Sequence, residues 1–317
     1  PQEPSRLWPG YPRRTDTYLQ FVNQVAELVA QDHPDRFLSA LFYVNYVEPP
    51  RQVELLPQVK VYFAPFQRCF RHPLRGDEAC RRPNAAYAEM LRQWRPLAPG
   101  QLLLFEYLML IDMVSAPYPL YRLLPEDFRF YRDLGVEGYV LEYRPAEWGP
   151  YGQHAHLIGE LSWDADADVP AALTRHFADL YGPAAGEMMA FWTSLEERFG
   201  QGGGCVHHYD LGYTRRATHQ LLRPALDCLG RAVALAASAE PRHREAVAQA
   251  QVSAQLLLLL GHWQDSLHQA VKIPKLADDA IVAAQELTDF ARRHADSGAL
   301  FAPGIMRRVE REMARLQ

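Results

Sequence analysis

The chain has 317 residues, of which 48% are hydrophobic and 22% are charged, and its formal net charge is −5. The longest apolar run, residues 250–261, contains glutamines and is much shorter than the ~20 residues of a membrane-spanning helix. The acidic balance provides no basic surface for nucleic acid. We therefore exclude a membrane span and nucleic acid, and expect either two domains or one large domain with an appendage.

Predicted strands and helices alternate in the first half of the chain. A helix is expected over residues 15–31, with Thr15 or Asp16 as its N-cap. Repeated strand–helix units of this kind form parallel sheets with right-handed crossovers. Four strands make either half of an eight-stranded barrel or a small open sheet. The expected strands are 36–46, 58–66, 101–112 and 136–143, and the further helices are 83–95, 125–134 and 152–163.

The composition changes after Trp163, and the rest of the chain is predicted to be helical. Asp168 is expected to cap the first of these helices, because Val169 and Pro170 follow it. The acidic run from Asp164 to Asp168 lacks the glycine and the distal glutamate of a calcium loop. We expect an α/β domain over 1–165 and a helical domain over 166–317. The expected helices are 169–180, a helix ending near 198, 212–238, 241–270, 275–295 and 302–316.

Residues 101–112, QLLLFEYLMLID, form the most informative segment. A continuous apolar run bounded by turn residues is typical of a strand buried on both faces. A carboxylate at its end, Glu106, needs a cavity or a partner. In β/α barrels, catalytic residues lie at the carboxyl ends of the strands. The four predicted strand ends carry Tyr43, Asn45 and Tyr46; Arg68 and His72; Glu106, Tyr107 and Asp112; and Glu142, Tyr143 and Arg144.

These side-chain types suit carbohydrate chemistry, because sugars stack on aromatic rings and glycosidic cleavage uses two carboxyl groups. The cysteines and histidines show neither CxxC nor HExxH spacing, so no metal or other cofactor is predicted. Cys69 and Cys80 lie in one loop. They form a disulfide if the protein is secreted, or remain buried free thiols.

Several segments resemble the DUF4838 family, and the resemblance extends over nearly the whole chain. They include VKVYFAPFQRCFRHPL, LLLFEYLM, LGVEGYVLEY and LSWDADADVPAALTRHFADLYGPAAGEM. The most specific parts are the set formed by Arg68, Cys69, His72, Cys80 and Asn84, and the segment from WDADAD to YGPA.

The family is similar to glycoside hydrolases that have a (β/α)8 barrel and a helical C-terminal region. Its relatives are α-glucuronidases, hexosaminidases and the family 163 endo-β-N-acetylglucosaminidases. The resemblance implies that the four strands are barrel strands five to eight, and that the chain, which begins at Pro1, is a C-terminal portion. The end of strand four, which often carries the general acid in this barrel type, is then absent. A secreted or periplasmic location is also expected from the resemblance.

The expected reaction is hydrolysis of a β-linked glycoside, with an N-acetylglucosamine-containing glycan as one candidate substrate. Two other functions stay open: a non-catalytic carbohydrate-binding protein on the same scaffold, and a structural module whose polar strand-end residues pair with one another. In the first case the catalytic carboxylates are Glu106 and Glu142, and the substrate-binding residues are Tyr43, Asn45, Arg68, His72, Tyr107 and Tyr143.

Overall fold

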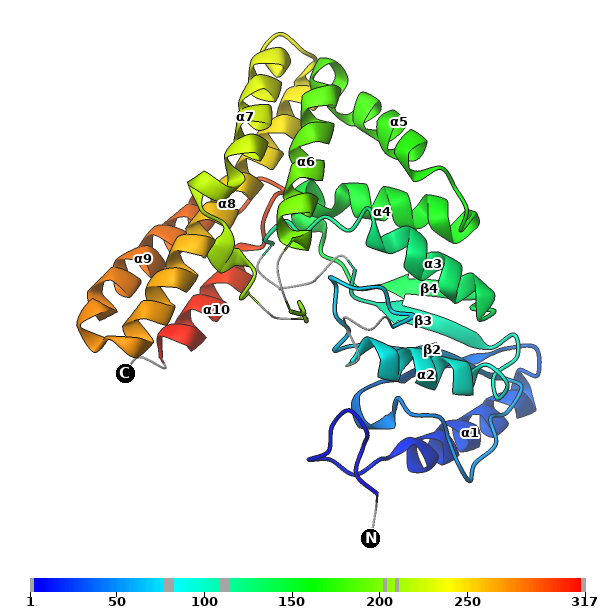
Figure 1. The fold of residues 1–317 in the computed structure, drawn as a ribbon. Helices are drawn as coiled ribbons and strands as arrows, with labels where there is room; N and C mark the ends of the chain where they lie inside the picture. The colour runs from blue at the N-terminus through cyan, green and yellow to red at the C-terminus, as the bar shows by residue number, and fades with distance from the viewer. Residues whose placement is uncertain (1–2, 77–82, 109–114, 202–203, 209–210, 315–317) are drawn as a thin grey trace. The chain divides into compact units, whose positions relative to one another are not determined.

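The computed structural model describes residues 3–76, 83–108, 115–201, 204–208 and 211–314 (Figure 1). The chain divides into two compact units. The first consists of residues 1–108, 122–142 and 161–166, and the second of residues 109–121, 143–160 and 167–317. The predicted domains, 1–165 and 166–317, stay a prediction, because the two units divide the chain at several points and not at one.

The first unit contains a parallel sheet of four strands in the order β1-β2-β3-β4 (Figure 1). The strands are β1 (Leu38–Phe42), β2 (Val59–Phe63), β3 (Leu102–Glu106) and β4 (Gly138–Leu141). Each strand pairs in parallel with the next one along the chain. Right-handed crossovers between sequential neighbours place every connecting helix on the same face of a sheet. The predicted α/β class with a parallel sheet is therefore confirmed.

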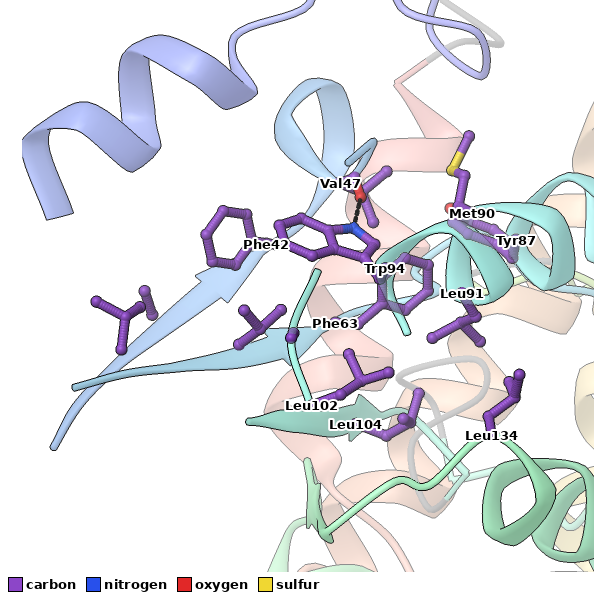
Figure 2. Packing of buried hydrophobic residues seen from close by; sticks show 14 of the residues in the cluster. Phe42, Val47, Phe63, Tyr87, Met90, Leu91, Trp94, Leu102, Leu104 and Leu134 are labelled. Atoms are coloured by element: carbon purple, nitrogen blue, oxygen red, sulfur yellow. Dashed lines mark hydrogen bonds between the residues drawn. The ribbon is translucent and has the colours of Figure 1, made fainter. Parts of the chain in front are cut away.

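Three helices cover that face: α1 (Thr15–Asp32), α2 (Asn84–Trp94) and α3 (Leu123–Asp133). Successive side chains of a strand point to opposite faces, and Phe42, Phe63 and Leu104 belong to the set that packs beneath the helices. Trp94 packs edge-on against Phe42 at 4.9 Å, and its indole N–H donates to the carbonyl of Val47 at 2.8 Å (Figure 2). This hydrophobic core joins the sheet to the helices that cover it, so that sheet and helices form two packed layers.

The opposite face of the sheet is also apolar but less buried. Leu41, Tyr62, Leu103 and Phe105 are half-buried there, and Val140 is 36% exposed. The side chains on the two faces therefore differ in burial, since the cluster of fully buried residues lies on the helix side.

The second unit is helical. Helix α4 (Trp148–Trp163) spans the division between the units, because its last residues belong to the first unit. In the described part of the chain, no helix combines the length and the apolar composition that crossing a membrane requires. The other helices are α5 (Val169–Tyr181), α6 (Ala185–Gly200), α7 (His219–Ala236), α8 (Pro241–Lys272), α9 (Ala277–Arg293) and α10 (Ala302–Met313).

The element types agree with the sequence predictions, and the differences lie at the ends. The strands are shorter than expected: β1 stops at Phe42 because the backbone turns at Val44, which has a φ of +54°. Asp168 caps α5 as predicted, accepting a hydrogen bond from the amide of Ala171 at 3.0 Å. The predicted cap of α1 is wrong, because Arg14 occupies that position without a side-chain cap.

Asp16 instead holds a loop against the start of α1. Its Oδ1 atom accepts hydrogen bonds from the amides of Arg51, Gln52 and Val53 at 2.9, 2.7 and 3.2 Å. Partial burial raises the pKa of Asp16, but these amide bonds and the Arg13 guanidinium outweigh that effect, so the pKa lies below its ordinary value. The carboxylate therefore contributes stability above the unfolded-state pKa, and this contribution disappears as the pH falls through the lower folded-state pKa.

We predict that Asp16→Ala lowers the free energy of unfolding at pH 7 by about 1 kcal/mol, since solvent screens part of the charge. The loss should shrink as the pH falls below the ordinary aspartate pKa, 3.8. Urea denaturation at several pH values measures it. Asp35→Ala is the control, because Asp35 is 73% exposed and pairs with exposed Arg36. An equal, pH-independent loss in both variants would contradict the prediction.

Candidate active site

A fully buried arginine lies where β2 and β3 end on the helix side of the sheet. Arg68 Nη1 donates to Glu106 Oε1 at 2.8 Å and to Tyr131 Oη at 3.0 Å. Arg68 Nη2 forms an ion pair with Asp127, and the hydroxyl of Tyr131 donates to Glu106. Asp127 and Tyr131 come from α3. The guanidinium thus joins the loop after β2, the end of β3 and helix α3.

Burial and the neighbouring charges act in opposite directions in this network: burial raises the pKa of Asp127 to about 6, although Arg68 acts to lower it. Burial lowers the pKa of Arg68, but Asp127 and Glu106 outweigh that effect, and the pKa of Arg68 lies well above its ordinary value. Burial, followed by the adjacent Glu106, raises the pKa of Tyr131 well above its ordinary value. Tyr131 therefore stays a neutral hydrogen-bond donor while Arg68 stays a cation. Glu106 Oε2 is buried without a hydrogen-bond partner among the described residues.

Asn84 fixes the loop that carries Arg68. Its Oδ1 atom accepts from the amide of Cys69 at 2.7 Å, and its Nδ2 atom donates to the carbonyls of Cys69 and His72 at 3.1 and 2.8 Å. Cys69 Sγ lies 3.2 Å from His72 Nδ1. Cys69 is a buried free cysteine, and Cys80 lies outside the described residues. These contacts explain in structural terms most of the set formed by Arg68, Cys69, His72, Cys80 and Asn84.

Aromatic rings form a row along the carboxyl ends of the strands. Tyr43 contacts Phe66 at 5.5 Å, Phe66 contacts Tyr107 at 5.3 Å, and Tyr107 contacts Phe105 at 5.4 Å between ring centroids. Tyr43 has an extended backbone, so it continues the alternation of β1 onto the face opposite Phe42. Tyr107 follows Glu106 and likewise belongs to the face opposite it.

Glu142 belongs to that same face. Its amide donates to the carbonyl of Glu106 at 3.0 Å, which extends the ladder between β3 and β4 by one residue. Since Phe105 pairs with Val140, Glu142 shares the row of Tyr107, while Glu106 pairs with Leu141 on the helix side. Glu142 is half-buried and Glu106 is fully buried. The two predicted catalytic carboxylates therefore lie on opposite faces of the sheet.

The other predicted site residues have separate positions. Asn45 donates to the carbonyl of Pro12 at 2.6 Å and so holds the N-terminal segment. Tyr143 is 51% exposed and belongs to the second unit. Asp112 lies outside the described residues.

The sequence predictions did not assign a role to Asp127, Tyr131 or Asn84. Asp127 and Tyr131 lie within a predicted helix, and the hydrophobic periodicity of that helix does not distinguish them from its other residues. The signal for them was Arg68 itself, because a buried guanidinium requires carboxylate partners. The signal for Asn84 was its place in the motif, four residues after Cys80.

The family described as "Domain of unknown function (DUF4838)" matches residues 7–193. The chain belongs to this family. No curated protein matches it. One solved structure, a GH138 enzyme targeting pectin rhamnogalacturonan II, is similar with a TM-score of 0.47 and 10% sequence identity. The match covers 95% of this chain and 48% of that one, so the chain spans about half the length of the solved protein.

The comparison confirms the expected family, with a matched span that ends at residue 193. The finer relation to family 163 stays a prediction, and the similarity to the solved structure is too distant to carry an argument about function. The geometry of the chain's own residues must therefore support any functional proposal.

We predict that Arg68→Met lowers the free energy of unfolding by about 3–5 kcal/mol, because it leaves two buried carboxylates without their cation. Arg75→Met is the matched control, since the pair of Arg75 with Glu126 on α3 is exposed and should contribute about 1 kcal/mol or less. Urea denaturation of both variants measures the difference. A loss for Arg68→Met as small as that of the control would show that the network is not a stabilising centre.

Proposed function

We propose that this chain is part of a carbohydrate-active protein of the glycoside hydrolase type, with the sugar at the carboxyl ends of β1 to β4. The observation that supports it best is the placement of half-buried Tyr43 and Glu142, together with the buried ring of Tyr107, on the face opposite the helices at those ends. Aromatic rings provide stacking surfaces for sugars, and a carboxylate beside them can act in glycosidic cleavage.

The proposal includes the fold around the site, which we take to be half of a (β/α)8 barrel. Three features support it: the strands follow one another in chain order, the helices cover one face, and the other face is apolar. In such a barrel, side chains from all the strands fill the interior. The inner face of these four strands would therefore pack against side chains from the remaining strands. Leu41, Tyr62, Leu103 and Phe105 would then be interior residues.

We assign the catalytic carboxylate first to Glu142, because it is half-buried and shares a face with the aromatic row. Glu106 is the second candidate. Its Oε2 atom has no hydrogen-bond partner among the described residues, while Oε1 is bound by Arg68 and Tyr131. In this proposal Arg68 acts on the site by orienting Glu106, and His72 is held beside Cys69.

For the substrate, we propose a β-linked glycoside, with N-acetylglucosamine-containing glycans as the first class to test. This choice follows the motif resemblance, which includes Arg68, Cys69, His72 and Asn84. Retaining hydrolysis requires carboxyl groups about 5–5.5 Å apart and inverting hydrolysis about 6.5–9.5 Å.

A non-catalytic carbohydrate-binding protein is the second candidate function. The observation that favours it is the ion pair between Arg68 and Glu106, which uses one predicted catalytic carboxylate for structure. This alternative keeps the aromatic row as the binding surface and requires no turnover.

We predict that Glu142→Gln lowers kcat by at least about 100-fold while the melting temperature stays unchanged, because general acid–base groups contribute about 10²–10⁴-fold. Turnover of nitrophenyl β-glycosides, including the β-N-acetylglucosaminide, by the full-length protein that contains the proposed barrel provides the measurement. Glu137→Gln is the control, since Glu137 is exposed at the opposite end of β4. Sugar binding without turnover by the unchanged protein would favour the binding function, and turnover with an inert Glu142 would exclude its assignment.

We predict a different result for Glu106→Gln. It should lower the free energy of unfolding by about 3–5 kcal/mol, because it leaves the buried Arg68 cation with one carboxylate instead of two. Urea denaturation and turnover are measured on the same preparation, below the unfolding transition. A loss of kcat with unchanged stability would instead make Glu106 the reacting carboxylate.

A further inference from the structure

The second unit contains a cavity of about 550 Å³ between α7 and α8. One face of α8 forms its floor, with Leu258 and Leu259 half-buried there. The short helix Thr214–Arg216 and the first residues of α7 form the wall. No aromatic ring of Phe, Tyr or Trp lines the cavity, so its described lining differs from the aromatic row of the first unit.

A close backbone approach builds the wall. A Cβ atom on Gly261 would lie 2.7 Å from the carbonyl oxygens of Thr214 and Ala217. Only glycine therefore lets the turn 214–217 lie directly on α8. The Thr214 hydroxyl donates to the carbonyl of Leu211 at 2.8 Å and holds the turn from the other side. The position of Arg215 at the mouth of the cavity follows from this fixed turn.

The polar side chains around the apolar floor include one cation, Arg215, and one anion, Asp265. Arg215 Nη2 lies 3.9 Å from Asp265, at the limit of an ion pair, and Arg215 Nε has no hydrogen-bond partner among the described residues. Asp265 also accepts from Gln269 at 2.7 Å. His219 and His262 complete the rim. The unpaired first amides of α7 add a partial positive charge, because Thr218 caps only the amide of Leu221.

The pKa of neighbouring His268 lies below its ordinary value. Burial lowers the pKa of His268, and Arg215 and Lys272 lower it further, while Asp265 acts in the opposite direction.

We propose that this cavity binds a small amphipathic anion, namely a carboxylate attached to an aliphatic body. The carboxylate meets the Arg215 guanidinium and the first amides of α7, and the aliphatic body lies on Leu258 and Leu259. Charge-assisted hydrogen bonds orient the head, and burial of apolar surface holds the body. The site is independent of the carbohydrate function proposed for the first unit.

Calorimetric titration of the whole chain with octanoate, octylammonium and acetate tests the proposal. Octanoate should bind at least about tenfold more tightly than octylammonium, which has the same chain length and the opposite charge, while acetate, which lacks the apolar body, should not bind measurably. Arg215→Gln should weaken octanoate binding by about tenfold, since one charge-assisted contact is lost. Leu259→Asp should abolish it.

Arg242→Gln is the matched control, because Arg242 lies in the first turn of α8, pairs with Glu240 and is 71% exposed. It should leave octanoate binding unchanged. Circular dichroism melting confirms that each variant keeps its helices, and Arg215→Gln decides the result if Leu259→Asp does not fold. Absence of octanoate binding, equal binding of both eight-carbon probes, or unchanged binding by Arg215→Gln would each overturn the proposal.

Discussion

The first unit depends on one constraint, which is that the guanidinium of Arg68 is buried away from solvent. Arg68 is completely buried, and a buried cation is tolerated only when carboxylates and further hydrogen bonds surround it. Glu106 from β3, and Asp127 and Tyr131 from α3, meet this requirement together. The guanidinium consequently links the loop after β2, the end of β3 and helix α3 at one point. The hydrophobic core alone would fix the relative positions of these elements less closely.

The same constraint places the buried ion pair and the proposed sugar-binding residues on different faces of the sheet. Because side chains alternate across a strand, the residue that reaches Arg68 cannot also face the other side of the sheet. Glu106 takes the helix side, and Tyr107 takes the other side, in the row of Tyr43, Phe66 and Glu142. One segment thus carries an anchoring carboxylate on one face and part of the proposed sugar-binding site on the other, and a shift of a single residue in register would exchange these roles.

The two units bury their apolar surface differently. In the first, the helices cover one face of the sheet and leave the other apolar and half-buried, which is the basis for proposing a barrel. In the second, helices pack against helices, and Gly261 lets the turn 214–217 lie directly on α8. The same turn forms one wall of the cavity with the apolar floor, so packing residues would also shape the proposed binding site.

The sequence by itself determined the kinds and order of the elements, the parallel sheet, the Asp168 cap and the family, because periodicity, capping and motifs are local properties. It also singled out Arg68, Glu106, Tyr107 and Glu142. Only the tertiary structure decided that Arg68 and Glu106 bind each other while Tyr107 and Glu142 share the opposite face. The partners of a buried charge come from α3, distant in sequence, and neither a strand's exact end nor its register can be read from local pattern.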